Sequence, residues 1–213
     1  MVDRDKIAHL QYITTGATPA EIAREVASFL CGGGRWVQLR MKDAPDRAVA
    51  EVAEMLLVPV HACGGVLIVD DRVEVAARVG ADGVHLGRDD MSPAEARAIM
   101  GDAIIGATAN TADHIMEAVA AGVDYIGLGP FRYTATKKRL APVLGAEGYR
   151  TVLSSCGAEL PPVVAIGGIT PDDMDTLAAT GVWGVAVAGA IARSADAVAA
   201  TERFVELTQK YFG

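Results

Sequence analysis

Eight short runs rich in β-branched and aromatic residues alternate along the chain with longer stretches of helical period. This alternation is typical of βα units arranged around a parallel sheet. The predicted strands begin near Leu10, Trp36, Val66, Gly83, Ile104, Tyr125, Val163 and Gly184. Eight such units in 213 residues predict an α/β fold, a single-domain (β/α)8 TIM barrel over residues 1–213. An open, doubly wound sheet is the alternative, although no GxGxxG motif follows the first strand to support it.

The predicted helices lie between these strands, and several begin with a Ser or Thr cap followed by proline. They span residues 18–30, 45–57, 73–79, 92–100, 111–120, 147–155, 171–179 and 195–211. Pro59 is expected to end or kink the second helix, because proline lacks a backbone N–H. Residues 130–145 remain unassigned, and a loop of that length in a tightly connected chain is more often functional than accidental.

Composition and charge narrow the classes of function. Hydrophobic residues make up 51% of the chain and charged residues 22%, which excludes a disordered or fibrous protein. The net charge of −8 would repel a nucleic-acid backbone or an anionic membrane, and no apolar run is long enough to cross a bilayer. We therefore expect small-molecule substrates, with neither nucleic acid nor membrane as a partner. Whether the chain forms a homo-oligomer is left open by the sequence.

The cysteines and the N-terminus bear on location. Cys31, Cys63 and Cys156 are odd in number and lack CxxC spacing, so neither a disulfide framework nor a zinc site is indicated. We expect all three to be small core residues in a reducing compartment. The charged start of the chain leads into the first strand without a signal-peptide pattern, which predicts a soluble cytoplasmic protein.

The second predicted strand ends in an amide and two cations. In a barrel, the carboxyl ends of the strands converge on one mouth. Gln38, Arg40 and Lys42 alternate with Leu39 and Met41, so the three polar side chains share one face. Two cations at the mouth suit a polyanion such as diphosphate. The alternative is an ordinary surface salt-bridge pair.

Carboxylates follow the next two predicted strands. The third strand runs into Asp70 and Asp71, and the fourth ends in a segment that contains His85 and Asp90. Carboxylates used one or two at a time, together with substrate phosphates, commonly hold Mg²⁺. The alternatives are helix capping by the aspartates and a hydrogen-bonded strand histidine without a substrate role.

Phosphate-binding features cluster after the sixth, seventh and eighth strands. The loop after the sixth contains Thr134, Thr136 and Lys137, whose hydroxyl and ammonium groups can bind phosphoryl oxygens. Gly168 and Gly189 follow the last two strands, where barrels commonly bind phosphate through backbone N–H groups. The alternatives are a solvated Lys-Lys-Arg run and plain tight turns.

Taken together, the strand ends predict Mg²⁺ with a diphosphate on one side of the mouth and a separate phosphate pocket on the other. Two phosphorylated substrates fit that layout. It indicates a transferase with diphosphate as leaving group, because Mg²⁺ and the cations stabilise the charge that develops on departure.

Five ordered motifs along nearly the whole chain resemble the thiamine-phosphate synthase family. They are Gln38-x-Arg40-x-Lys42; Asp70-Asp71; Asp82-Gly-Val-His85-Leu-Gly87 with Asp90; Gly127-x-Gly129-Pro130 followed by Thr134-x-Thr136-Lys137; and Ala165-Ile-Gly-Gly168-Ile169. The resemblance implies Mg-dependent coupling of 4-amino-2-methyl-5-pyrimidinylmethyl diphosphate with (carboxy)thiazole ethyl phosphate. The products are thiamine phosphate and diphosphate, formed through a dissociative pyrimidinylmethyl cation.

The same resemblance implies a role for each matching residue. Asp71 and Asp90 would hold Mg²⁺. The catalytic groups would be Arg40, Lys42, Thr108 and Lys137, which with Asp70 surround the diphosphate, while Gln38 lies by the pyrimidine. The other substrate-binding positions, assigned mostly to the thiazole phosphate, would be His85, Thr134, Thr136, Gly168, Ala188 and Gly189.

Four positions depart from the family pattern. Asp70 replaces the common Asn, Arg88 replaces Gln, and Thr108 and Gly189 each replace Ser. Ionised Asp70 cannot donate a hydrogen bond to diphosphate, so we expect it to bind metal or to pair with a cation, for which Arg88 is one candidate.

Two other functions remain as alternatives. The first is a thiazole tautomerase of the same barrel family, which needs a general acid/base but no metal. Its relatives have His in the strand-5 turn, which here reads Thr108-Ala109-Asn110. The second is a non-catalytic sensor that binds thiamine phosphate without turning it over.

Overall fold

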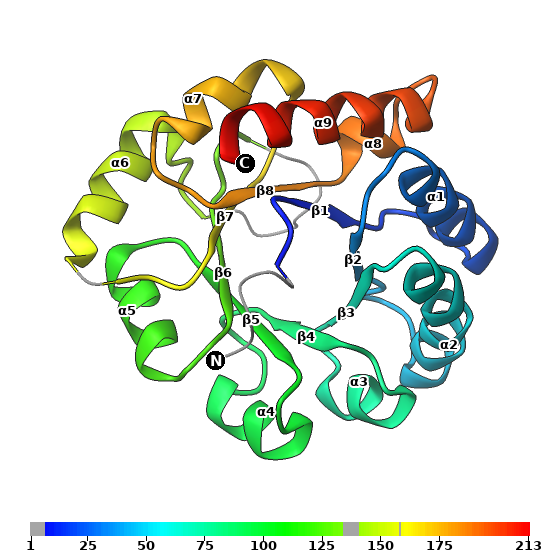
Figure 1. Cartoon of the computed structure of the whole chain (residues 1–213). Helices are drawn as coiled ribbons and strands as arrows, with labels where there is room; N and C mark the ends of the chain where they lie inside the picture. Colours follow the sequence, from blue (N-terminus) through cyan, green and yellow to red (C-terminus); the bar gives the residue numbers. More distant parts are fainter. Residues whose placement is uncertain (1–6, 134–140, 158) are drawn as a thin grey trace.

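The computed structural model describes residues 7–133, 141–157 and 159–213, and these form a closed barrel of eight parallel strands surrounded by helices (Figure 1). The strands follow the order of the sequence, and β1 also pairs with β8, which closes the barrel. They are β1 (Leu10–Ile13), β2 (Trp36–Leu39), β3 (Val66–Asp70), β4 (Gly83–Leu86), β5 (Ile104–Ala109), β6 (Tyr125–Leu128), β7 (Val163–Ile166) and β8 (Gly184–Val187). Each strand begins at a predicted residue, and the (β/α)8 fold is confirmed.

The helices lie on the outside of the barrel, near their predicted positions. They are α1 (Pro19–Cys31), α2 (Asp46–Ala62), α3 (Val73–Val79), α4 (Pro93–Met100), α5 (Ala112–Ala120), α6 (Gly145–Cys156), the 3₁₀ helix η2 (Pro171–Asp173), α7 (Met174–Ala178), α8 (Gly189–Ala192) and α9 (Ala197–Phe212). The predicted helix over 171–179 is therefore two elements. The four-residue α8 was not predicted, because it is shorter than a window in which helical period can be recognised.

Capping explains where several helices begin. Thr18 and Ser92 each accept from the backbone N–H of a glutamate three residues on, and that glutamate bonds back to the cap. Asp196 caps α9 by accepting from the Ala199 N–H, so α9 starts two residues after its predicted first residue, Ala195.

Of the two outcomes expected for Pro59, an end or a kink of the second helix, the end does not occur. Helix α2 continues through Pro59 to Ala62. The carbonyls of Pro59 and Val60 accept from the N–H of Cys63, and the Val60 side chain is fully buried. Core packing of this last turn offsets the free-energy cost of the one backbone hydrogen bond that proline cannot donate.

Two hydrophobic cores position the mouth. The larger lies between the strands and the helices, whereas the smaller fills the interior of the barrel. The buried members of the inner core are Ile7, Ile13, Trp36, Ile68, Ile104, Tyr125, Val164 and Ala186. Above it, buried polar side chains replace apolar ones, among them Gln11, Gln38, Asp70 and His85. The apolar floor thus gives way to a polar layer near the carboxyl ends of the strands.

The cysteine prediction is only partly correct. Cys156 is buried, but Cys31 and Cys63 are exposed because they lie at or beyond the last turns of α1 and α2. Among the helices of the described residues, none combines the length and the apolar character needed to span a bilayer.

Candidate active site

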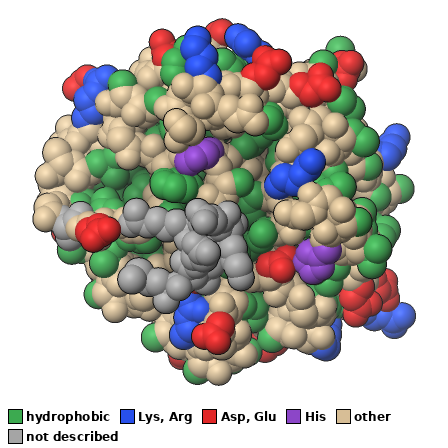
Figure 2. Space-filling view, viewed as in Figure 1, with side chains coloured by type: hydrophobic (Ala, Val, Ile, Leu, Met, Phe, Trp, Pro, Cys, Tyr) green, Lys and Arg blue, Asp and Glu red, His purple; other side chains and the backbone are tan. Residues whose placement is uncertain are grey.

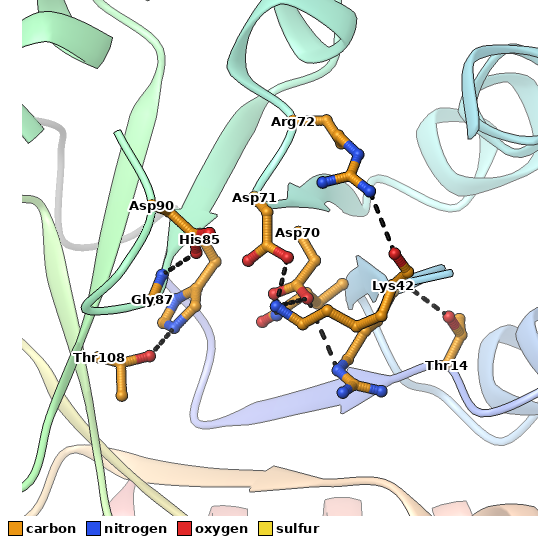
Figure 3. Close-up of polar contacts among 11 residues, drawn as sticks. Thr14, Lys42, Asp70, Asp71, Arg72, His85, Gly87, Asp90 and Thr108 are labelled. Atoms are coloured by element: carbon orange, nitrogen blue, oxygen red, sulfur yellow. Dashed lines mark hydrogen bonds and ion pairs between the residues drawn. The ribbon is translucent and has the colours of Figure 1, made fainter. Parts of the chain in front are cut away.

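Asp70, the last residue of β3, links the polar residues at the carboxyl end of β2 (Figure 3). Its Oδ1 accepts from the amide nitrogen of Gln38 at 2.6 Å. Its Oδ2 lies 3.6 Å from Nε of Arg40 and 3.3 Å from Nζ of Lys42. The two cations predicted to bind diphosphate are therefore already paired with a buried carboxylate of this protein.

Backbone contacts hold the segment that carries these cations. The buried Thr14 hydroxyl, at the end of β1, accepts from the N–H of Arg40 at 3.0 Å. The guanidinium of Arg72 donates to the carbonyl of Lys42 at 3.1 Å and pairs with Asp46 at the start of α2. Arg40 and Lys42 are thus positioned although they lie beyond the last residue of β2.

A single backbone conformation brings Asp71 to the same place as Asp70. Successive residues of a strand point to opposite faces, so two adjacent aspartates would normally diverge. Asp71 has φ of 64°, in the left-handed region that Asp tolerates better than most residues. The turn is held because the N–H of Asp71 donates to the carbonyl of His85. As a result both carboxylates lie beside Lys42 (Figure 3).

Asp71 and Asp90 form a pair of carboxyl groups at this turn. Burial, the nearby charge of Asp70 and the contact with Asp90 raise the pKa of Asp71 to about 7. The pKa of Asp90 is lowered despite burial, because its carboxylate is hydrogen-bonded by Asp71 and by the Gly87 N–H. Burial lowers the pKa of Lys42, but the negative charges of Asp70 and Asp71 raise it by more. The pKa of Lys42 is therefore above its usual value. The pair is electrostatically unfavourable without a proton or cation between its members.

These two carboxylates fit a divalent cation. Oδ1 of Asp71 is buried and has no hydrogen-bond partner within the described part of the chain. The Asp71 side chain is only 6% exposed, whereas Asp90 belongs to an exposed loop. Within the described ranges no cluster of three or more His, Cys, Asp or Glu side chains could hold a metal. Two carboxylates with open positions suit Mg²⁺, which commonly keeps waters and takes substrate oxygens.

Helix capping, the alternative explanation for these aspartates, is not what the structure contains. Helix α3 has Arg72 at its N-cap position without a side-chain hydrogen bond, and α4 is capped by Ser92. Asp90 instead accepts from the N–H of Gly87 at 2.7 Å, inside its own loop.

Arg88, one candidate cation for Asp70, is paired elsewhere. Nη1 of Arg88 lies 2.6 Å from Glu117 on α5. Its guanidinium is therefore engaged between neighbouring βα units, and Asp70 pairs with Arg40 and Lys42 instead.

His85 and Thr108 complete the β4–β5 side of the mouth. Nε2 of His85 lies 2.9 Å from the Thr108 hydroxyl, and Nδ1 lies 2.9 Å from the hydroxyl of Tyr125. A Cβ at Gly127 would lie 3.1 Å from the His85 ring, and one at Gly106 would overlap the Tyr125 ring. These strand glycines admit the two rings into the barrel, so Gly127 serves internal packing as well as any approach of substrate.

The turns after β7 and β8 lie on the other side of the barrel, because β7 is four strands from β3 in the closed order. Gly167 and Gly168 have φ of 101° and 69°, in the region that favours glycine. The turn itself therefore requires glycine at these positions, as the tight-turn alternative expects. The carbonyl of Gly168 accepts from Arg132 at 2.7 Å, and Arg132 also pairs with Asp173. The mouth thus has an acidic and cationic half facing a glycine-rich half.

Ala188 and Gly189 form the turn after β8. The carbonyl of Ala188 accepts from the N–H groups of Ile191 and Ala192, which begins α8. A Cβ at Gly189 would overlap the guanidinium of Arg193, so the absence of a side chain admits this arginine. The predicted positions are at the mouth, and a cation lies beside them that sequence analysis missed.

Three predicted residues, Thr134, Thr136 and Lys137, lie outside the described residues. Among the others, Gln38, Arg40, Lys42, Asp70, Asp71 and Asp90 come together around β2–β4. Sequence analysis missed Thr14 and Tyr125, which look like ordinary strand residues, and Arg193. The i, i+4 spacing of Gly189 and Arg193 is the one signal in the sequence that could have indicated this contact.

Figure 2 shows positive and negative side chains interspersed around the face in view.

Comparisons with known proteins identify the family of this chain. Residues 10–191 match the family model described as thiamine monophosphate synthase. The chain is 46% identical over 207 residues to a thiamine-phosphate synthase of Phocaeicola vulgatus, covering 95% of this chain and 99% of that protein. It is 45% identical over 202 residues to a thiamine-phosphate synthase of Bacteroides thetaiotaomicron, covering 93% and 96% respectively.

Solved structures give the same result. Thiamine phosphate pyrophosphorylase from Pyrococcus furiosus superposes with a TM-score of 0.87 at 35% identity, covering 99% of both chains. A 3-hexulose-6-phosphate synthase matches at 16% identity with a TM-score of 0.71, which indicates the shared barrel alone. The full-length match in sequence and structure shows that this chain belongs to the thiamine monophosphate synthase family of transferases.

Proposed function

We propose that this enzyme couples 4-amino-2-methyl-5-pyrimidinylmethyl diphosphate with thiazole ethyl phosphate, giving thiamine phosphate and diphosphate. Family membership and the names of the relatives support the reaction. The observation that carries the substrate assignment is the divided mouth. Two cations and a carboxyl pair lie after β2, β3 and β4, and glycine turns lie after β7 and β8.

The proposed reaction breaks one bond and forms another. The C–O bond between the pyrimidinylmethyl carbon and the diphosphate breaks, and its electron pair leaves with the diphosphate. The lone pair of the thiazole nitrogen then forms the new C–N bond, so no proton has to move at that nitrogen. Arg40, Lys42, Thr108 and Lys137 would stabilise the negative charge on the departing diphosphate. Gln38 would position the pyrimidine, since Asp70 already orients its amide.

Asp71 and Asp90 would hold Mg²⁺, which when bound supplies additional positive charge for the diphosphate. The protein contributes a buried carboxylate on one side and an exposed one on the other. This arrangement leaves room for substrate oxygens on the solvent side. Bound cation would also favour the ionised form of Asp71, whose pKa is raised by burial and by the nearby charge of Asp70.

The phosphate of the thiazole substrate would lie on the opposite half of the mouth. Gly168, Ala188 and Gly189 would present backbone N–H groups there, with Thr134 and Thr136 from the loop after β6. On the diphosphate side, His85 would contribute through Thr108, to which it is hydrogen-bonded. A cytoplasmic location, homo-oligomer formation and acceptance of the carboxylated thiazole remain predictions.

The test is to incubate the purified protein with both substrates in Mg²⁺ or in EDTA, and to measure thiamine phosphate after oxidation to fluorescent thiochrome. Asp71→Ala should lower Mg²⁺-dependent turnover by at least about 100-fold, because it removes a direct ligand. Asp89→Ala, at an exposed neighbour of Asp90, is the matched control and should keep wild-type turnover.

Other outcomes would contradict either the metal assignment or the proposed reaction. Equal turnover in EDTA, or an active and metal-independent Asp71→Ala variant, would overturn the metal assignment. If both substrates bind but no product forms, the thiazole tautomerase or the thiamine-phosphate sensor becomes the function to test.

A further inference from the structure

A chain of hydrogen bonds crosses the polar layer of the barrel from β1 to the mouth. Nε2 of Gln11 donates to the Tyr125 hydroxyl at 3.2 Å. That hydroxyl lies 2.9 Å from Nδ1 of His85, and Nε2 of His85 lies 2.9 Å from the hydroxyl of Thr108. Four strands, β1, β6, β4 and β5, each contribute one residue.

The direction of these hydrogen bonds follows from burial. The Tyr125 side chain is 0% exposed, so its hydroxyl proton needs a protein acceptor. Gln11 is a donor to that oxygen, and the contact that can accept the Tyr125 proton is Nδ1 of His85. If Nδ1 carried a proton, two donors would face the Tyr125 oxygen and its own proton would be left unpaired in the core.

The tautomer of His85 then determines the role of Thr108. With Nδ1 as acceptor, a neutral imidazole has its proton on Nε2 and donates to the Thr108 oxygen. Thr108 therefore does not donate its own hydroxyl proton to His85. Thr108 lies one residue before the carboxyl end of β5, so its hydroxyl proton is available to a ligand in the mouth.

We propose that Gln11 and Tyr125 hold His85 in the Nε2–H tautomer, so that Thr108 accepts from His85 and donates its own hydroxyl proton to an anion in the mouth. Gln11, Tyr125 and His85 are positioning residues, and Thr108 is the group that touches the substrate. The identity of that anion as the substrate diphosphate rests on the proposed function. The tautomer does not.

The first experiment measures the tautomer directly and needs no substrate. Long-range ¹H–¹⁵N NMR of the ¹⁵N-labelled enzyme at neutral pH distinguishes the two tautomers and the imidazolium. The His85 signal, among those of four histidines, is assigned by its loss in His85→Asn. The expected result is Nε2–H. An Nδ1–H tautomer, which would require the Gln11 amide to be reversed, or an imidazolium would overturn the proposal.

The second experiment is a double-mutant cycle on turnover. Thr108→Val should lower kcat about 10–100-fold and Tyr125→Phe about tenfold, whereas Thr108→Ser keeps the hydroxyl and should stay within about threefold. If Tyr125 acts through Thr108, adding Tyr125→Phe to Thr108→Val should change kcat by less than about twofold. Independent, multiplied losses would show a merely structural role and refute the coupling.

Tyr149→Phe is the matched control. Tyr149 is also fully buried and its hydroxyl donates to the carbonyl of Leu128, so this variant loses a comparable hydrogen bond outside the chain of contacts. Its kcat should remain within about twofold of wild type. If the NMR result holds but no thiamine phosphate is made, the proposed function fails and the tautomer proposal stands. If thiamine phosphate forms but His85 is not the Nε2–H tautomer, the proposed function stands and the tautomer proposal fails.

Discussion

Replacing Asp70 by asparagine should make the protein less stable and, at the same time, a better binder of diphosphate. Asp70 is the buried anion that neutralises Arg40 and Lys42 when no substrate is present. Asparagine has the same shape and keeps an oxygen for the hydrogen bond from Gln38, so the change is chiefly one of charge.

The size of each effect follows from the contacts. Two ion pairs at 3.6 and 3.3 Å are lost, but the Arg40 and Lys42 side chains are 21% and 39% exposed and can be solvated. We therefore expect a loss of about 1–2 kcal/mol in the free energy of unfolding rather than the larger cost of stranding a buried charge. For a chain of this length the melting temperature should fall by about 2–8 °C.

The gain in affinity comes from removing a repulsion. A diphosphate oxygen bound to the same ammonium group as Asp70 would lie about 6 Å from the carboxylate, which at an effective dielectric constant of about 40 costs about 1.4 kcal/mol. Asp70→Asn should therefore bind inorganic diphosphate about tenfold more tightly.

Calorimetry measures both quantities: titration with inorganic diphosphate in EDTA at fixed ionic strength, and thermal unfolding of the same samples. Asp124→Asn is the control, because Asp124 is a buried acid paired with Arg97 at the opposite end of β6 from the mouth. It should lose stability without any change in diphosphate affinity. An Asp70→Asn variant that binds diphosphate no more tightly would refute the argument.

Two further predictions concern packing and the loop after β6. Gly106→Ala should destabilise the protein by about 3 kcal/mol, seen as a fall of about 6–12 °C in thermal unfolding, because the new Cβ would overlap the buried Tyr125 ring. Unchanged stability would mean that the ring is not held against β5. Lys137→Ala should lower turnover far more than Lys138→Ala in the thiochrome assay. Equal losses would favour a solvated charge run.

Local pattern was enough to predict the strands and most of the helices of this barrel. Strand starts such as Leu10 and Trp36 depend on runs of four or five residues, and caps such as Thr18 depend on residues three positions apart. Where nearby packing competes with local preference, prediction failed. Pro59 lies inside α2 because the buried Val60 holds the last turn in the core.

The amino-acid sequence by itself determined which strand ends are polar, and so the composition of the mouth. Only the tertiary structure decided how those groups pair. Asp70 meets Gln38 across 32 residues of chain, and Tyr125 meets Gln11 across 114. Asp71 joins them through a positive φ that residue type allows but does not require. Such contacts exist because eight parallel strands close into a ring, and no pattern within one strand records which side chains that closure brings together.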